Sequence, residues 1–350
     1  MEMQMEIVDL KEDNSQWNEF LGKNEHLIFH NPAYKKFIEE AFNCEYKILG
    51  FLEEDTLKVI LPLVEINSLL FGNKIISSAY LEYGGFAGEG RFIPMAVNLI
   101  EERYKDNYDF LEIRGGLEFF NNISDNILSS KLIKKSLYKR FVLQLTGEEE
   151  VWKNVQHSKR KAVNKALRDL EVKEVPFSDL NTFYSLYCRN MKRFGSPPYS
   201  KKYFISFYKN IVDGNLGKVF GAYHQGKLVS ALLGFCYLDR VHIIISVADE
   251  SYREFRPSDA MHWKFIQWAC QKGYKYFDFG RVREESGQFE YKRKWGPELL
   301  ELPSYFLLWK NKEVPFVDPD SHKLLVKVWR TLPLWFTARI GMKLRKKLGI

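Results

Sequence analysis

Two stretches of this chain repeat one plan about 170 residues apart, and a duplication of this kind restricts the fold more than any other feature. Residues 46–65 and residues 217–237 both read as strand, polar turn and strand. Residues 108–115 likewise resemble residues 274–281. Short strand segments can also resemble each other by chance. We interpret the pattern as two copies of one α/β unit, fused in tandem.

Helical spacing of apolar residues occurs between these strands, over residues 31–42, 149–170, 179–194 and 257–272. The last of these helices lies between a predicted strand at 241–248 and another at 276–279. The first copy has the same order, with a strand at 75–79, a helix at 94–104 and a strand at 110–113. Strand, helix, strand is the core of acetyltransferase-like folds.

The chain has 350 residues, of which 45% are hydrophobic, so it can form two domains with proper cores. We expect an N-terminal domain over 1–147, a second over 148–312 and a tail over 313–350. The four cysteines (Cys44, Cys188, Cys236 and Cys270) are scattered, which argues against a zinc or disulfide framework and favours a reducing compartment. The N-terminus does not read as a signal peptide, and no apolar run is long enough to span a bilayer. These features predict that the bulk of the chain is cytoplasmic and holds no metal.

The net charge of +7 is concentrated at the C-terminus. Residues 321–350 contain eight Lys or Arg and no Asp or Glu, interleaved with Trp and Leu. Pro333 divides this tail into two short amphipathic helices. The pattern is typical of helices that lie on an anionic membrane surface. The alternative is a tail packed on the N-terminal domain with its cations in water.

The strongest local motif runs from Phe277 to Gly296. A buried strand reaches a glycine turn at Gly280, and a polar loop then leads to Tyr291, Lys292 and Trp295. Aromatic walls lower the local dielectric, so a lysine held there would act strongly on a developing oxyanion or on a phosphate. Alternatively, the aromatic residues belong to the core and Lys292 is solvated.

This motif, with the letters FDFGR, ESG and YKRKWG, resembles the C-terminal signature of the Fem-type (FemAB-like) aminoacyltransferases, which build peptidoglycan interpeptide bridges. Residues 77–85, 157–166, 191–204 and 253–263 resemble other segments of that family. The resemblance spans about residues 25–310. The chain lacks the long coiled-coil arm of some members, which weakens the carry-over of tRNA binding.

The resemblance implies two tandem GNAT-like (acyl-CoA N-acyltransferase-like) lobes, each a mixed, mostly antiparallel sheet flanked by helices. It implies transfer of an aminoacyl group, from aminoacyl-tRNA as co-substrate, to an amine on a lipid-linked or nucleotide-linked peptidoglycan or other envelope precursor. No tightly bound cofactor is implied, and we expect a monomer. Lys292 would lie near the reacting ester and stabilise charge, and Tyr291 and Trp295 would shape the pocket.

Asp278 is the second catalytic candidate, because it lies on the strand that reaches the motif and could orient the acceptor together with Arg281. A buried ion pair of Asp278 with Arg281 or Arg283 explains it equally well. The substrate-binding candidates are Tyr291, Trp295, Arg281, Arg253, Arg256, Tyr199, Lys201, Tyr203, Arg160 and Lys36. Core packing of the tyrosines and solvation of the cations are their alternatives.

The stretch from Arg253 to Ala260 stands where acetyltransferases cradle the CoA pyrophosphate on backbone N–H groups. It lacks both glycines of such a loop, and Pro257 has no N–H to donate. Arg253 and Arg256 could still bind a phosphate through their side chains. A CoA-dependent N-acyltransferase acting on an amino sugar or exopolysaccharide precursor therefore stays as the alternative function. A membrane-surface module without catalysis is a third possibility.

Overall fold

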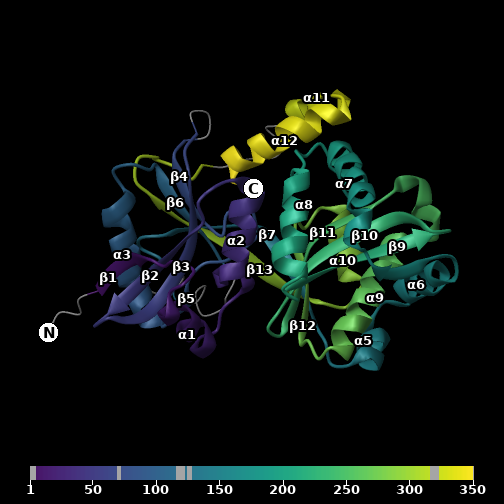
Figure 1. The fold of residues 1–350 in the computed structure, drawn as a ribbon, viewed down its shortest axis with the longest axis horizontal. Coiled ribbons are helices and arrows are strands. Elements are labelled where there is room, and N and C mark those ends of the chain that lie inside the picture. The colour runs from purple at the N-terminus through teal and green to yellow at the C-terminus, as the bar shows by residue number, and fades with distance from the viewer. Residues whose placement is uncertain (1–4, 69–71, 116–122, 124–127, 316–322, 350) are drawn as a thin grey trace. The chain divides into compact units, whose positions relative to one another are not determined.

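The fold is described from a computed structural model that places residues 5–68, 72–115, 123, 128–315 and 323–349 (Figure 1). The chain forms two compact units. Unit 1 comprises Met1–Leu137, Leu302–Ser321 and Lys343–Ile350, and unit 2 comprises Tyr138–Glu301 and His322–Met342.

These limits differ from the expected boundaries after residues 147 and 312, and two long strands explain the difference. Strand β7 (Ile133–Gln144) begins in unit 1, but its residues from Tyr138 onward belong to unit 2, where they pair with β12 (Tyr276–Val282). Strand β13 (Glu298–Leu308) begins in unit 2, but its residues from Leu302 onward belong to unit 1, where they pair with β6 (Phe110–Arg114). Each sheet is thus completed by a strand from a distant part of the chain.

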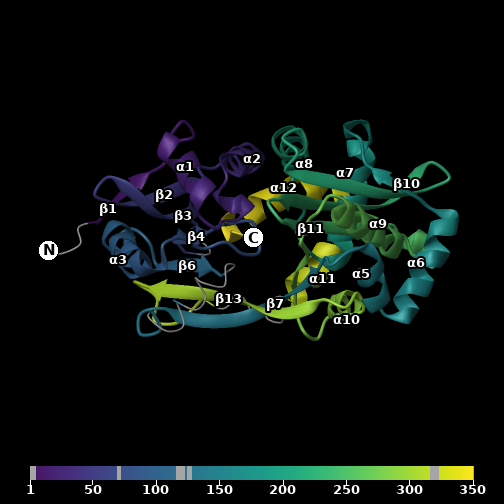
Figure 2. The ribbon, with the colours of Figure 1, turned by 90° about the horizontal axis from the view of Figure 1, so that it is seen from below.

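Unit 1 contains a sheet in the order β1 (Met5–Asp9), β2 (Lys47–Glu53), β3 (Thr56–Ile66), β4 (Lys74–Ser77), β6 (Phe110–Arg114) and β13, and the short β5 (Ala87–Gly88) pairs with β3. β4 and β6 run parallel, and the other described pairs are antiparallel. Helices α1 (Ser15–Lys23) and α2 (Pro32–Phe42) lie on one side of this sheet, and α3 (Ile93–Tyr104) lies on the other (Figure 2). Asn31 caps α2 by accepting from the Ala33 N–H, as its sequence predicts.

Unit 2 repeats this plan. Its sheet has the order β8 (Glu171–Glu174), β9 (Gly217–His224), β10 (Lys227–Tyr237), β11 (Arg240–Ala248), β12 (Tyr276–Val282) and β7. β11 and β12 run parallel, and the other described pairs are antiparallel. Helices α7 (Leu180–Phe194) and α8 (Lys201–Phe207) lie on one side of the sheet, and α9 (Pro257–Gln271) lies on the other (Figure 2). The shared topology confirms the repeat and the predicted mixed, mostly antiparallel sheets flanked by helices.

Two local predictions need correction. The helix expected over 149–170 is two helices, α5 (Glu148–Asn154) and α6 (His157–Asp169), because Val155 adopts an extended conformation. The polar loop after β12 forms a further helix, α10 (Gly287–Arg293), whose first turn is capped when the Ser286 hydroxyl accepts from the Phe289 N–H. This cap sets the position of the side chains that follow it.

The C-terminal tail forms α11 (Lys323–Thr331) and α12 (Leu334–Leu348), separated at Pro333 as predicted. Within these helices, the residues as far as Met342 belong to unit 2, and those from Lys343 belong to unit 1. Every helix that the structure describes is too short or too polar to cross a membrane.

Candidate active site

The candidate site lies in unit 2, where β11 and β12 cease to pair. The parallel ladder joins Arg240–His242 to Tyr276–Asp278 and then ends, although both strands continue beyond it. Gly280 follows with a φ of 72°, in the left-handed region that glycine adopts at little strain. The backbone of β12 beyond Asp278 therefore has carbonyl groups that β11 does not bind.

Lys292 on α10 binds these carbonyls. Its Nζ donates to the carbonyl oxygens of Gly280 at 3.1 Å and Arg281 at 2.9 Å. The side chain is half-buried, so the ammonium is neither freely solvated nor sealed in the core. The Lys292 ammonium is thus bound to the protein backbone.

Aromatic side chains surround α10 on its inner side. The Trp295 side chain is fully buried, and its indole N–H has no hydrogen-bond acceptor among the described residues. The Tyr291 ring meets Trp295 edge-on, with 6.4 Å between their centroids. His262 on α9 stacks on Phe279 at 6.0 Å and meets Tyr291 edge-on at 5.5 Å. Trp295 is therefore a core residue as well as a wall of the site.

A buried ion pair lies beneath these rings. Lys159 on α6 donates to Asp259 on α9 at 2.6 Å, and the two side chains are only 6% and 7% exposed. The Lys159 ammonium also lies 3.6 Å from the centroid of the Tyr291 ring, close enough for a strong cation–π interaction. Burial lowers the pKa of Lys159, and the Asp259 carboxylate opposes that shift. The pair fixes α6, α9 and α10 to one another.

Sequence reasoning missed Lys159 and Asp259, although a signal was present. Lys159, Val163 and Ala166 follow one another at helical spacing, so they share the buried face of α6. Asp259 likewise shares the buried face of α9 with His262 and Ile266. A charged residue on each of two buried faces predicts that they meet as a pair.

His262 is neutral in this setting. Its Nδ1 lies 2.7 Å from the Ser258 carbonyl oxygen, to which it donates, and 3.3 Å from the Tyr291 hydroxyl oxygen. Burial lowers the pKa of His262 to about 4. Burial, and to a lesser degree the nearby Asp259 carboxylate, raises the pKa of Tyr291, so its phenol stays protonated at neutral pH.

We predict that acid destabilises the protein between pH 6.5 and about 4, because burial also lowers the pKa of His30 in unit 1 to about 4. In this window the unfolded chain binds protons at both histidines and the folded chain does not, so stability falls as the pH falls. The loss reaches about 3 kcal/mol per histidine.

Urea unfolding between pH 7 and pH 4 measures this effect. His262→Gln should flatten the pH dependence, and the exposed His157→Gln should leave it unchanged. Equal slopes for these two variants would contradict a neutral, buried His262.

Asp278 is completely buried. One carboxylate oxygen accepts from the Arg140 guanidinium at 3.0 Å, and the other accepts from the Gly280 N–H at 2.9 Å. The expected buried ion pair therefore exists, and it includes Arg140, which the sequence did not single out. The guanidinium of Arg281 lies over the Tyr138 ring, 4.8 Å from its centroid. Asp278 thus holds the turn whose carbonyl binds Lys292.

Several other candidates have contacts of their own. Tyr199 is buried and stacks on Tyr203 with 4.2 Å between centroids, in an aromatic cluster around α8, as the packing alternative predicts. Lys201 is exposed in the first turn of α8. Arg160 on α6 donates to the Trp152 and Lys153 carbonyls at the end of α5. Lys36 is exposed on α2 in unit 1.

The start of α9 has few free backbone donors. Arg256 adopts a left-handed conformation with φ of 55°, and its carbonyl accepts from the N–H groups of Asp259 and Ala260. Pro257 has no N–H to donate. In this described turn, Ser258 therefore has the one backbone N–H group that binds no backbone carbonyl. The Arg253 and Arg256 side chains are exposed beside it.

Comparison with known proteins supports this architecture. Residues 154–293 match the family model described as "Acetyltransferase (GNAT) domain". This range includes α6, α9 and α10. Residues 154–293 are a GNAT-type acyltransferase domain. The GNAT domain indicates an acyltransferase enzyme.

Solved structures extend the fold likeness to both units. FemX has a TM-score of 0.70 at 11% identity, with 92% of this chain and 100% of FemX covered. The C-terminal domain of a putative lysylphosphatidylglycerol synthetase from Agrobacterium fabrum has 0.59 at 11%, with 85% and 91% covered. A tandem GNAT protein from the clavulanic acid biosynthesis pathway has 0.56 at 10%, with 89% and 100% covered. No curated protein matches the chain significantly in sequence. The chain thus has a Fem-like tandem GNAT fold.

Proposed function

We propose that this acyltransferase moves an aminoacyl group from aminoacyl-tRNA to an amine on a peptidoglycan or other cell-envelope precursor. The observation that supports this donor is the start of α9, where the Asp259 and Ala260 N–H groups already bind the Arg256 carbonyl. A CoA pyrophosphate needs several free N–H groups at such a helix start. An aminoacyl ester needs no such cradle. The fold likeness to FemX and to a lysylphosphatidylglycerol synthetase supports the same donor class.

In the proposed reaction, the amine attacks the ester carbonyl carbon. A C–N bond forms, the C–O bond to the tRNA ribose breaks, and the proton lost by the amine balances the one gained by the leaving hydroxyl. Lys292 would donate to the oxyanion that develops on the carbonyl oxygen. Because the ester is already activated, positioning and charge stabilisation would supply most of the rate enhancement.

The other residues would have supporting roles in this proposal. Tyr291 and Trp295 would exclude water, which strengthens the action of the lysine on the oxyanion. Asp278 would act as a positioning residue, since it holds the Gly280 turn to which Lys292 is bound. Lys159 would position α10 through the Tyr291 ring.

The test is transfer of a labelled amino acid from a mixture of charged tRNAs to lipid-linked and nucleotide-linked muropeptides. We expect label in the precursor only when the tRNA is charged. Absence of transfer from every charged tRNA, together with turnover of an acyl-CoA, would overturn the proposal.

A CoA-dependent N-acyltransferase acting on an amino sugar or exopolysaccharide precursor is the second candidate. It is favoured by the match to an acetyltransferase domain and by the exposed Arg253 and Arg256 beside α9. Thermal unfolding separates the two candidates. Acetyl-CoA should raise the melting temperature only if the second is right, and Arg253→Ala with Arg256→Ala should then abolish that rise.

A further inference from the structure

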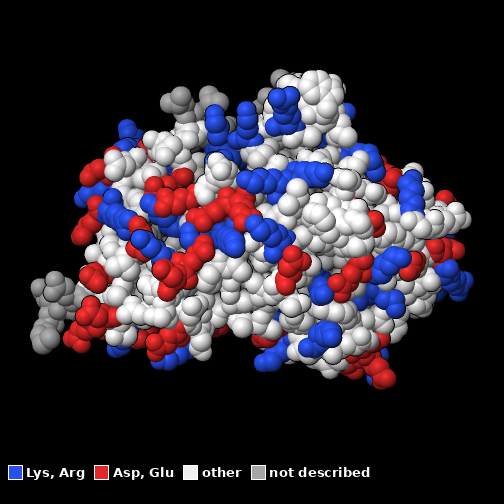
Figure 3. Space-filling model, viewed as in Figure 1, with Lys and Arg blue, Asp and Glu red and all other residues white. Residues whose placement is uncertain are grey.

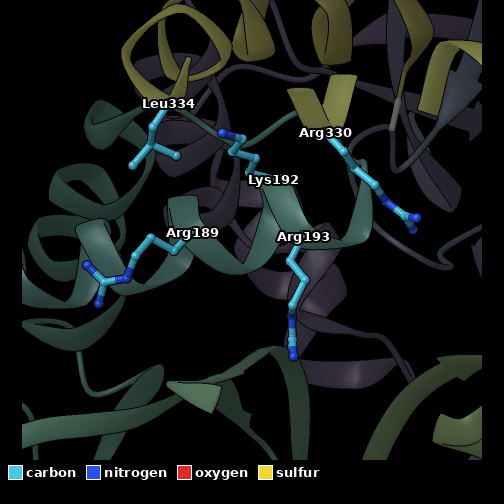
Figure 4. Close-up of a pocket in the computed structure, with 5 residues that line it drawn as sticks. All are labelled: Arg189, Lys192, Arg193, Arg330 and Leu334. Atoms are coloured by element: carbon cyan, nitrogen blue, oxygen red, sulfur yellow. The ribbon is translucent and has the colours of Figure 1, made fainter. Parts of the chain in front are cut away.

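A basic pocket of about 420 Å³ lies in unit 2 between α7 and the tail helices. Its lining residues are Arg189, Lys192, Arg193, Arg330 and Leu334 (Figure 4). The first three come from the last two turns of α7, and the other two come from α11 and the start of α12. Four of the five lining residues are cations, so the pocket favours an anion.

Among the described residues, two of these cations have acidic neighbours and two do not. Arg193 forms an ion pair with Glu250, and Arg189 lies 3.8 Å from Asp249. The side chains of Lys192 and Arg330 form no hydrogen bond or ion pair with any residue that the structure describes. In this shallow pocket, a phosphate group can accept a charge-assisted hydrogen bond from the Lys192 ammonium or the Arg330 guanidinium.

Large apolar side chains are exposed along the same helices. Trp335 is 69% exposed, Val328 is 50% exposed and Phe336 is 36% exposed. Figure 3 shows Lys and Arg side chains gathered along the edge of the molecule where α11 and α12 lie in Figure 1. Exposed aromatic and aliphatic groups among cations are typical of helices at a membrane surface.

The tail helices pack on unit 2, so these exposed apolar side chains do not belong to an unattached end of the chain. Thr337 is buried, and Gly341 lies so close to Pro198 that a side chain there would clash. On α11, Val326 packs against Gly195 at the end of α7. One side of the tail therefore packs on unit 2, and Val328, Trp335 and Phe336 are held outward.

We propose that α11 and the start of α12 dock on an anionic membrane, with the basic pocket receiving the phosphate of a lipid headgroup. A nucleic acid would also satisfy the cations, but it would leave the aliphatic Val328 without an apolar environment. The absence of any Asp or Glu over residues 321–350 favours the anionic leaflet further. This inference is independent of the donor and of the acceptor in the reaction.

Vesicle co-sedimentation of the full chain tests the proposal. We expect binding to vesicles of phosphatidylglycerol and phosphatidylcholine, little binding to phosphatidylcholine alone, and loss of binding in 1 M salt. Lys192→Gln with Arg330→Gln should weaken binding about thirty-fold, since each cation near the leaflet contributes roughly a factor of five. Trp335→Ser should weaken it without changing the number of charges.

Lys165→Gln with Lys272→Gln is the matched control, because it removes two exposed cations of unit 2 outside the pocket. Inorganic phosphate, compared with chloride at equal ionic strength, should displace the vesicles from the wild type more than from the pocket variant. Equal weakening by the pocket and control variants would overturn the pocket assignment. Binding of uncharged tRNA with no binding to anionic vesicles would overturn the membrane proposal.

Discussion

Asp259→Asn is expected to destabilise the protein by about 3–5 kcal/mol, the typical effect of removing one partner from a buried ion pair. The substitution leaves the Lys159 ammonium buried with no carboxylate beside it. Urea unfolding at pH 7 measures the loss. The loss should shrink at higher pH, because burial already lowers the pKa of Lys159 and the amine can then lose its proton.

Two variants make this prediction specific. Glu290→Gln breaks the exposed pair with Arg293 on α10, which should leave stability nearly unchanged. Lys159→Met combined with Asp259→Leu removes both charges and should recover most of the stability. A loss under about 1 kcal/mol for Asp259→Asn would mean that the pair is not buried in solution.

Lys292→Ala is expected to lower the rate of acyl transfer about 10²–10³-fold, the usual effect of removing one oxyanion donor. The effect should appear in kcat rather than in KM, because the donor would act on charge that develops only in the transition state. Single-turnover transfer from charged tRNA at saturating acceptor measures it.

Arg293→Ala is the matched control, since it removes one cation from the same helix and its partner is the exposed Glu290. Its rate should stay near that of the wild type. Because Lys292 also binds two carbonyls of β12, the unfolding midpoint of Lys292→Ala must be measured beside the rate. An unchanged rate in a folded Lys292→Ala would remove this residue from the mechanism.

The roles of the site residues differ in how well the sequence predicts them. The pattern from Phe277 to Gly296 correctly indicates one local cluster, because its members are close in the chain and α10 brings them together. The local sequence also suggests a buried ion pair for Asp278 and core packing for Tyr199, and both side chains are buried. The local sequence does not predict which residues from distant parts of the chain contact these two side chains.

Lys159 illustrates that gap. Read along the chain, it is one cation among several on a basic helix, and a solvated face is the simplest interpretation. In the fold its ammonium is buried against Tyr291 and Asp259. Conversely, the sequence makes Lys36 and Lys201 candidates for substrate binding, but both side chains are exposed in their own units.

The amino-acid sequence by itself determined the duplicated α/β plan, the hairpins, the strand–helix–strand order and the break at Pro333. These features follow from apolar periodicity and turn residues, which act over a few neighbours. Only the tertiary structure decided that Lys159 meets Asp259, 100 residues away, that Asp278 meets Arg140, 138 residues away, and that β7 and β13 complete sheets distant in sequence. Such pairs depend on which buried faces pack together, and this packing cannot be predicted from any short stretch of the sequence.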